Sequence, residues 1–190
     1  MDDDDDGPRG DLSAAPDGIL ATRASHGDTE AFDELLHRHT PIVRAFVYRI
    51  VGTLAETDDV VQEAFLTAWR QLTTLRDPDA VRAWLMKIAS REAYAHVKKR
   101  RPHATLDGFD RAADPHLLPE ATAIRNAQLN ALSAALDTLP DAQRRCWLLR
   151  EVGSLSYTEI AEEMNLPVST VRGHLARARA SITIRMEGWR

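Results

Sequence analysis

The sequence has few of the features that identify secreted proteins, membrane proteins and enzymes. Its 190 residues contain one cysteine, Cys146, which excludes an intramolecular disulfide framework and a zinc site built from several cysteines. No apolar run is long enough to cross a bilayer, and the N-terminus lacks the basic-then-apolar order of a signal peptide. We therefore expect a cytoplasmic protein with no membrane insertion.

Motifs of catalysis and cofactor binding are missing as well. The sequence contains no HExxH, no GxSxG and no glycine-rich phosphate loop, and the apolar neighbours of Cys146 favour a buried, unreactive thiol. His37 and His39 are two positions apart, so on a helix they would point to different faces and make a poor metal pair. We expect no catalytic residue, no metal and no cofactor, and hence no enzyme.

The negative charge of the chain is concentrated at its start. The net charge is −5, but residues 1–18 hold seven aspartates and one arginine, a balance of −6, which leaves +1 for the remainder. An acidic segment of this composition cannot bury a core. We expect residues 1–18 to form a disordered acidic tail, so the overall acidity does not argue against nucleic-acid binding by the rest of the chain.

Helical periodicity accounts for nearly all of the following residues, and no alternating strand pattern competes with it. The expected helices before residue 102 are 19–25, one capped by Asp28 and stopped by Gly52, one capped by Thr57 or Asp58 that runs to about 75, and one over about 79–101. Residues 102–123 contain three prolines, a glycine and little periodicity, which is typical of a linker. The predicted fold class is all-α: two small helical domains, 19–101 and 124–186, joined by a flexible linker.

The second domain contains the most informative segment, residues 156–180. One apolar stripe at helical spacing ends where Pro167 interrupts the pattern, and Ser169 is placed to cap a second helix. That helix turns Val171, Leu175 and Ala178 inward and carries basic residues outside. Two helices across a short turn, the second one basic, predict a helix-turn-helix that binds DNA. An ordinary helical hairpin with a solvated basic face is the alternative.

The third expected helix has two unlike faces. Its core stripe consists of Val61, Ala64, Phe65, Ala68 and Leu72. On the opposite side, Leu66 lies among charged and polar residues, namely Asp59, Gln62, Glu63 and Arg70. A leucine in such surroundings suggests a docking surface, although a solvated face is an equally open interpretation.

The fourth expected helix is strongly basic. Between residues 82 and 101 it holds seven lysines and arginines, and Glu92 is the one acidic residue there. Such a cluster would attract DNA phosphates. We assign Trp84 to the core, whereas Tyr94 could equally stack on an exposed base. A basic helix end also complements the helix dipole, but four consecutive cations exceed that need.

These segments together resemble a known family. The runs ETDDVVQEAFLTAWRQL and VRAWLMKIASREAYAHVKKRRP resemble the second domain of bacterial sigma factors, and LSYTEIAEEMNLPVSTVRGHLARAR resembles their fourth domain. These two domains follow one another across a short linker, an order that resembles the extracytoplasmic-function (ECF) type of sigma factor. The resemblance covers nearly everything from about residue 19 to 184.

The resemblance implies a transcription initiation factor that binds core RNA polymerase, through its β′ clamp helices and its β flap, and promoter DNA. The implied polymerase contacts are Asp59, Gln62, Glu63 and Leu66. The implied contacts to the −10 element are Thr74, Arg76, Asp77, Lys87, Arg91, Tyr94, Lys98 and Arg101. The implied contacts to the −35 element are Ser169, Thr170, Arg172, His174 and Arg177. An anti-sigma factor is a common partner in the resembled family.

Three positions depart from the family pattern. Arg91 and Glu92 stand where the family commonly has an asparagine and an apolar residue, and Ala95 stands in place of an aspartate. A stand-alone helix-turn-helix regulator with an N-terminal sensing or interaction domain is the alternative function. Such a regulator would bind a palindromic site as a free dimer, whereas a sigma factor depends on polymerase. A small helical hydrolase would instead show a metal or substrate requirement.

Overall fold

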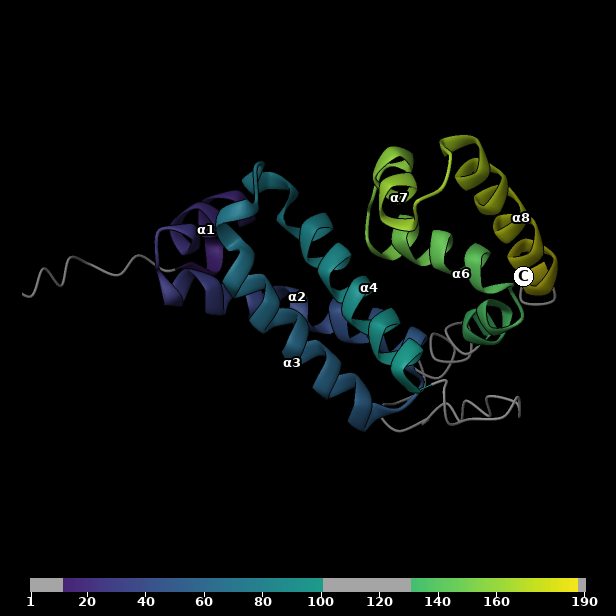
Figure 1. Cartoon of the computed structure of the whole chain (residues 1–190), viewed down its shortest axis with the longest axis horizontal. Coiled ribbons are helices and arrows are strands. Elements are labelled where there is room, and N and C mark those ends of the chain that lie inside the picture. The colour runs from purple at the N-terminus through teal and green to yellow at the C-terminus, as the bar shows by residue number, and fades with distance from the viewer. Residues whose placement is uncertain (1–11, 101–130, 188–190) are drawn as a thin grey trace, which may run out of the picture. The chain divides into compact units, whose positions relative to one another are not determined.

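The computed structural model describes residues 12–100 and 131–187, and the regular elements within these ranges are all helical. The chain divides into two compact units, Met1–His103 and Ala104–Arg190 (Figure 1). The predicted all-α fold class is confirmed. The predicted linker, 102–123, lies outside the described residues. None of the described helices combines the length and the apolar character needed to cross a membrane.

The first unit is built on three long helices. The elements in residues 12–100 are α1 (Asp17–Ser25), α2 (Thr29–Val51), α3 (Leu54–Gln71) and α4 (Val81–Arg100), with short 3-10 turns at Leu12–Ala14, Leu72–Thr74 and Pro78–Ala80. Helices α2, α3 and α4 pack on one another, and α1 packs on α2 (Figure 1). The centre of this core is formed by the fully buried side chains of Leu20, Leu35, Phe46, Val47 and Met86.

Both predicted limits of α2 are confirmed. The carboxylate of Asp28 accepts a hydrogen bond from the backbone N–H of Ala31 at 3.0 Å, which satisfies one of the donors left open at a helix start. Gly52 has a φ of 94°, in the left-handed region, and its N–H bonds the carbonyl of Tyr48. A residue with a side chain would be strained there, so the glycine ends the helix.

The predicted start of α3 is wrong, because the helix begins at Leu54 with Thr53 at the N-cap position. Thr57 is buried and its hydroxyl donates to the carbonyl of Thr53 at 2.6 Å. Asp58 pairs with Arg44 of α2. Neither side chain is therefore available as a cap. Likewise, the fourth predicted helix begins at Val81, after the separate turn Pro78–Ala80.

The described residues begin at Leu12, inside the segment predicted as a tail, and Arg38 of α2 holds this stretch. Its guanidinium donates to the carbonyls of Leu12, Ser13 and Ala15 at 2.8, 2.7 and 2.6 Å. It also donates to the carboxylate of Asp17 at 2.9 Å. One side chain thus replaces the backbone hydrogen bonds that a short turn cannot supply. Residues 1–11 of the predicted acidic tail lie outside the described residues.

The second unit contains the predicted helix-turn-helix. Residues 131–137 are helical, and they are followed by α6 (Asp141–Trp147), a π-helical turn (Leu148–Val152), α7 (Tyr157–Met164) and α8 (Val168–Met186). Ser156 and Glu159 form a capping box at the start of α7. Asn165 ends α7 in the left-handed conformation, with a φ of 51°. Val171, Leu175 and Ala178 are buried, as predicted.

Two details of this unit differ from the sequence prediction or extend it. Helix α8 begins at Val168 with Pro167 at the N-cap position and no side-chain cap, so Ser169 lies inside the first turn instead of capping it. Cys146 is fully buried, as predicted, with its Sγ 3.4 Å from the sulfur of Met164. Burial raises the pKa of the Cys146 thiol to about 11, against the opposing charge of Arg145.

Candidate functional site

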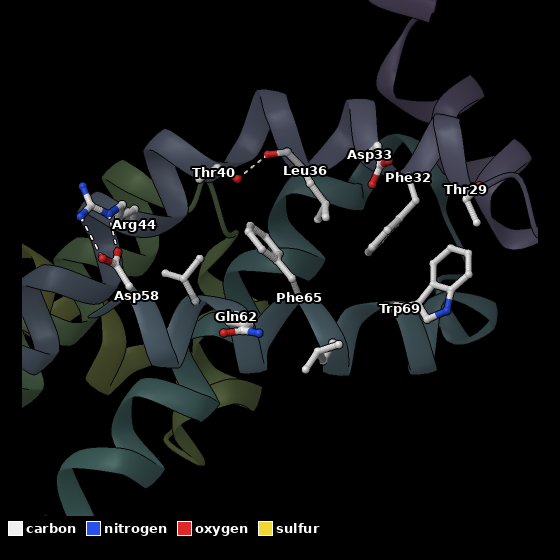
Figure 2. A pocket seen from close by; sticks show the side chains of 12 residues that line it. Thr29, Phe32, Asp33, Leu36, Thr40, Arg44, Asp58, Gln62, Phe65 and Trp69 are labelled. Carbon is white, nitrogen blue, oxygen red and sulfur yellow. Dashed lines mark hydrogen bonds and ion pairs between the residues drawn. The ribbon is translucent and has the colours of Figure 1, made fainter. Parts of the chain in front are cut away.

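The predicted docking face of α3 is exposed and borders a groove. Asp59, Gln62, Glu63 and Leu66 are all exposed, and 43% of the surface of Leu66 is accessible. Gln62 and Leu66 line a groove of about 580 Å³ between α2 and α3 (Figure 2). Two of the four predicted polymerase contacts therefore line this recess, where a partner would bury apolar surface. Asp59 and Glu63 instead line a smaller hollow of about 120 Å³ beside α4.

The walls of this groove are mainly apolar. Figure 2 shows Leu36 of α2 and Phe65 of α3 pointing toward one another across its middle. Both side chains are half-buried, although Phe65 was predicted to belong to the core stripe of its helix. At one end, Trp69 packs on Phe32 of α2 with the ring centroids 4.8 Å apart, and 38% of the tryptophan remains exposed. The recess thus exposes aromatic surface, which is common in protein interfaces.

An ion pair closes the opposite end of the groove. Arg44 of α2 donates to the carboxylate of Asp58 of α3 at 2.7 Å (Figure 2). The hydrogen bond from Arg44 holds the pKa of Asp58 below its usual value, against a small opposing effect of burial. This pair links the two helices at the rim and keeps that end of the groove polar. The recess therefore runs from an aromatic end to a charged end.

Sequence reasoning predicted the α3 face but missed the groove. The missing members are Leu36, Phe65 and Trp69, the last two adjacent to Leu66 on the helix. An available signal was the apolar group formed by Phe65, Leu66 and Trp69, because Trp69 is three residues from Leu66 and four from Phe65, and such spacings lie on one side of a helix. The sequence gives no local signal for the α2 wall of the groove, because that wall depends on how α2 and α3 pack.

The three predicted DNA contacts between α3 and α4 lie on the surface. Thr74, Arg76 and Asp77 are exposed. The hydroxyl of Thr74 donates to the carbonyl of Gln71 at 2.7 Å. The carboxylate of Asp77 accepts from the N–H of Asp79 at 3.1 Å and so initiates the turn Pro78–Ala80. Two of the three side chains thus shape the loop itself, which limits how they can contact a base.

Four predicted DNA contacts share one face of α4. Residues 87, 91, 94 and 98 fall within about 60° of one another when each residue advances about 100°. Arg91 and Lys98 are exposed, and Lys87 and Tyr94 are half-buried. The buried residues Leu85 and Ala89 lie on the opposite side of the helix. The helix therefore gathers three cations and an aromatic ring on one accessible surface. Arg101 lies outside the described residues.

Two residues of α4 differ from the roles expected for them. Glu92, placed where the family has an apolar residue, is half-buried toward α3 and accepts a hydrogen bond from the hydroxyl of Thr67 at 3.2 Å. That bond supplies a polar partner for a carboxylate in a helix interface. Trp84, expected in the core, is only half-buried. It lies about 20° from Arg91 on a helical wheel, at the edge of the basic face, by the advance of 100° per residue.

The predicted DNA contacts of the second unit lie on α8. Ser169, Arg172 and Arg177 are exposed, whereas Thr170 and His174 are half-buried. A guanidinium nitrogen of Arg177 lies 3.3 Å from Nδ1 of His174. Arg179, also on this helix, donates to Glu151 at 2.7 Å, and that bond raises the pKa of its guanidinium. Arg172 and Arg177 are therefore better placed for an external anion than Arg179.

The described residues give no sign of a metal centre, since they hold no group of three or more metal-ligating side chains. The arrangement instead offers an apolar groove on one surface of the first unit and basic helix faces on both units.

Comparison with known proteins gives the family. Residues 35–103 match Sigma-70 region 2, and residues 129–182 match Sigma-70, region 4. The chain is 33% identical to the RNA polymerase sigma-H factor of Pseudomonas aeruginosa over 181 residues, 90% of this chain and 94% of that protein. It is 34% identical to the ECF RNA polymerase sigma-E factor of Escherichia coli over 176 residues, 87% of this chain and 92% of that protein.

A solved structure supports the same relationship. The structure of CnrH in complex with the cytosolic domain of CnrY has a TM-score of 0.62 and 26% identity, and the match covers 91% of this chain and 98% of that one. Both sigma regions, the near full-length relatives and the fold agree. The chain belongs to the ECF sigma factors of the sigma-70 family.

Proposed function

We propose that this protein, as an alternative sigma factor, binds core RNA polymerase with the groove between α2 and α3 and promoter DNA with α4 and α8. The observation that carries the proposal is the separation of two unlike surfaces on the first unit. Exposed apolar and acidic residues border the groove, whereas Lys87, Arg91 and Lys98 share the outer face of α4. A factor that joins a protein to DNA needs two such surfaces.

The groove has the chemistry of a docking site for a helical partner. Its exposed leucine and tryptophan, Leu66 and Trp69, supply apolar area. Its lining includes the carboxylates of Asp33 and Asp58, while those of Asp59 and Glu63 lie further round α3, toward α4. Burial of apolar area supplies most of the affinity, and rim charges select the partner and its orientation. We assign this surface to the β′ clamp helices, with Asp59, Gln62, Glu63 and Leu66 as direct contacts.

The basic face of α4 has the chemistry of a promoter contact. Lysine and arginine neutralise phosphates, and a half-buried tyrosine such as Tyr94 presents a ring on which a base can stack. We assign Lys87, Arg91, Tyr94 and Lys98 to the −10 region of the promoter. Thr74, Arg76 and Asp77 in the preceding loop, and Arg101, which lies outside the described residues, complete the assignment.

Helix α8 is proposed to read the −35 element in the major groove. The second helix of a helix-turn-helix enters the groove with its N-terminal residues toward the bases. In α8 these are Ser169, Thr170 and Arg172, followed by His174 and Arg177. The same unit would also meet the β flap of polymerase. Residues 19–101 would thus bind polymerase and the −10 element, and residues 124–186 the −35 element.

The proposal includes a regulator and a location. The solved relative CnrH is bound to the cytosolic domain of CnrY. We propose that this chain is also bound by a protein partner, an anti-sigma factor that competes with polymerase for it. Because polymerase and chromosome meet in the cytoplasm, we place the protein there. It acts by binding and not as an enzyme.

The test is run-off transcription with purified core polymerase across genomic promoter fragments. Transcripts should start at specific promoters only when the protein is added. The free protein should bind the same fragments weakly in a gel-shift assay. If instead the free protein binds a palindromic site as a dimer and core polymerase adds nothing, the chain acts as a stand-alone regulator and the proposal is wrong.

A further inference from the structure

We propose that Gly173 is the point of closest approach between α8 and promoter DNA, and that its missing side chain lets Arg172 and Arg177 reach the DNA from either side. The inference rests on the proposed −35 role of α8. It adds a specificity-determining residue that acts by the absence of a side chain.

Gly173 lies at the crest of the exposed face of α8. The buried stripe of this helix is formed by Val171, Leu175, Ala178 and Ile182. With an advance of about 100° per residue, Gly173 lies within about 20° of the direction opposite that stripe. Arg172 then lies about 100° to one side of Gly173 and Arg177 about 40° to the other. At this position the exposed face of the helix therefore consists of backbone alone.

Nothing within the described part of the unit requires a glycine at this position. The described glycines with a positive φ are Gly27 and Gly52, so Gly173 has an ordinary helical backbone that alanine adopts as well. A Cβ added at Gly173 would meet the guanidinium of Arg177 first, at 3.4 Å from one nitrogen and 3.6 Å from the other. These are ordinary contact distances to the mobile end of an exposed side chain.

Gly153 in the same unit shows what a structurally required glycine looks like. A Cβ added there would lie 2.7 Å from the carbonyl oxygen of Leu149 and 3.0 Å from a methyl carbon of Leu155. Backbone and core would have to move. Gly173 has no such neighbour, although glycine inside a helix is unfavourable relative to alanine. Since the described part of the unit does not account for the glycine, we assign its role to what the helix binds.

Arg177 covers this bare backbone in the free protein. Its guanidinium lies over Gly173 and one of its nitrogens is 3.3 Å from Nδ1 of His174. A major groove admits one helix with little space to spare. On DNA binding, Arg177 would turn outward to a phosphate, and the uncovered backbone of Gly173 would move against the DNA. A methyl group at position 173 would hold the helix away from that surface.

The test is Gly173→Ala in the full-length protein, with two readouts expected to change in opposite directions. The thermal midpoint should rise, by about 2 to 4 °C, because alanine favours the helix. Binding of the reconstituted holoenzyme to a matched promoter should fall about tenfold, the typical cost of overpacking a close contact. Gly173→Ser should give a larger loss than Gly173→Ala because it adds more volume.

Thr183→Ala is the matched control, since Thr183 is an exposed residue of the same helix about three turns further on. It should also favour the helix and should leave promoter binding unchanged. A promoter with a scrambled −35 element tests the −35 role of α8 separately from the role of Gly173. If scrambling has no effect on the wild-type holoenzyme, the proposed −35 role of α8 fails. If scrambling matters but Gly173→Ala binds as well as the wild type, only the role of Gly173 is overturned.

Discussion

Glu56 in the first turn of α3 accepts a hydrogen bond of 2.9 Å from the guanidinium of Arg100 at the end of α4. The same carboxylate accepts from the hydroxyl of Thr53 at 2.7 Å and lies 3.5 Å from Nε2 of His96. Burial raises the pKa of Glu56, but the bond from Thr53 and the charges of Arg100 and His96 outweigh it, so the pKa is lowered overall. One cation of the basic helix end is thus neutralised by the protein itself.

Replacement of Glu56 by glutamine removes the negative charge beside Arg100 and should make its guanidinium more available to a DNA phosphate. We expect the salt dependence of holoenzyme binding to promoter DNA to increase by about one phosphate contact. The stability should change by less than about 1 kcal/mol, because the pair is partly exposed. Glu92→Gln is the control: it changes the net charge equally, but Glu92 binds Thr67. Equal slopes for the two variants would mean that net charge, and not the Arg100 contact, is responsible.

Two exposed leucines on α3 allow a matched test of the groove. Leu66 borders the groove, whereas Leu54, which is 47% exposed, lies in the first turn of the same helix and outside the groove lining. Leu66→Asp should weaken binding to core polymerase by about 1–3 kcal/mol, because the interface would have to bury a charge. Leu54→Asp should leave affinity unchanged. Fluorescence anisotropy with labelled protein measures both, and equal affinities for the two variants would remove Leu66 from the interface.

The capping carboxylate of Asp28 predicts a specific acid sensitivity. The hydrogen bond from the N–H of Ala31, followed by that from Arg23, lowers the pKa of Asp28. A carboxyl group with a lowered pKa stabilises the fold above its unfolded pKa, near 4, and the contribution is lost as the pH falls through the folded pKa. Asn is an equally good cap but does not titrate.

Asp28→Asn should therefore match the wild type in urea unfolding at pH 7 and lose less stability between about pH 5 and pH 3, the range set by the lowered pKa. If the variant loses as much stability as the wild type over this pH range, Asp28 does not contribute to the acid sensitivity.

Arg172 and Arg177 should play different parts in reading the −35 element. They are five positions apart and project about 140° apart, so both cannot point straight at bases. Arg172→Ala should cost about 1–3 kcal/mol at the matched sequence and relax discrimination at one position. Arg177→Ala should weaken all sequences about equally and lower the salt dependence by about one phosphate contact. Holoenzyme binding to −35 variants over a salt series measures both. If Arg172→Ala lowers the affinity for every −35 variant by the same factor, Arg172 contacts a phosphate and does not read a base.

Local sequence signals predicted the fold well where one residue decides the outcome. Asp28 and Gly52 delimit α2 because a cap and a left-handed glycine act within a single turn. The start of α3 was placed wrongly because Thr57 and Asp58 also look like caps, and only tertiary packing engages them elsewhere. The same limit applies to the candidate site. The face of α3 follows from helical spacing, but the groove requires Leu36 and Phe32 from α2.

The buried thiol of Cys146 makes this chain a convenient background for spectroscopy. It is the one cysteine in the sequence, it has no accessible surface, and its pKa of about 11 keeps it protonated at neutral pH. Since the thiolate is the reactive species, maleimide dyes should not label Cys146 in the folded protein. A cysteine introduced at an exposed position in each unit would therefore carry a donor and an acceptor without removal of the native residue. The distance between the two sigma regions, free and on polymerase, then becomes measurable by energy transfer.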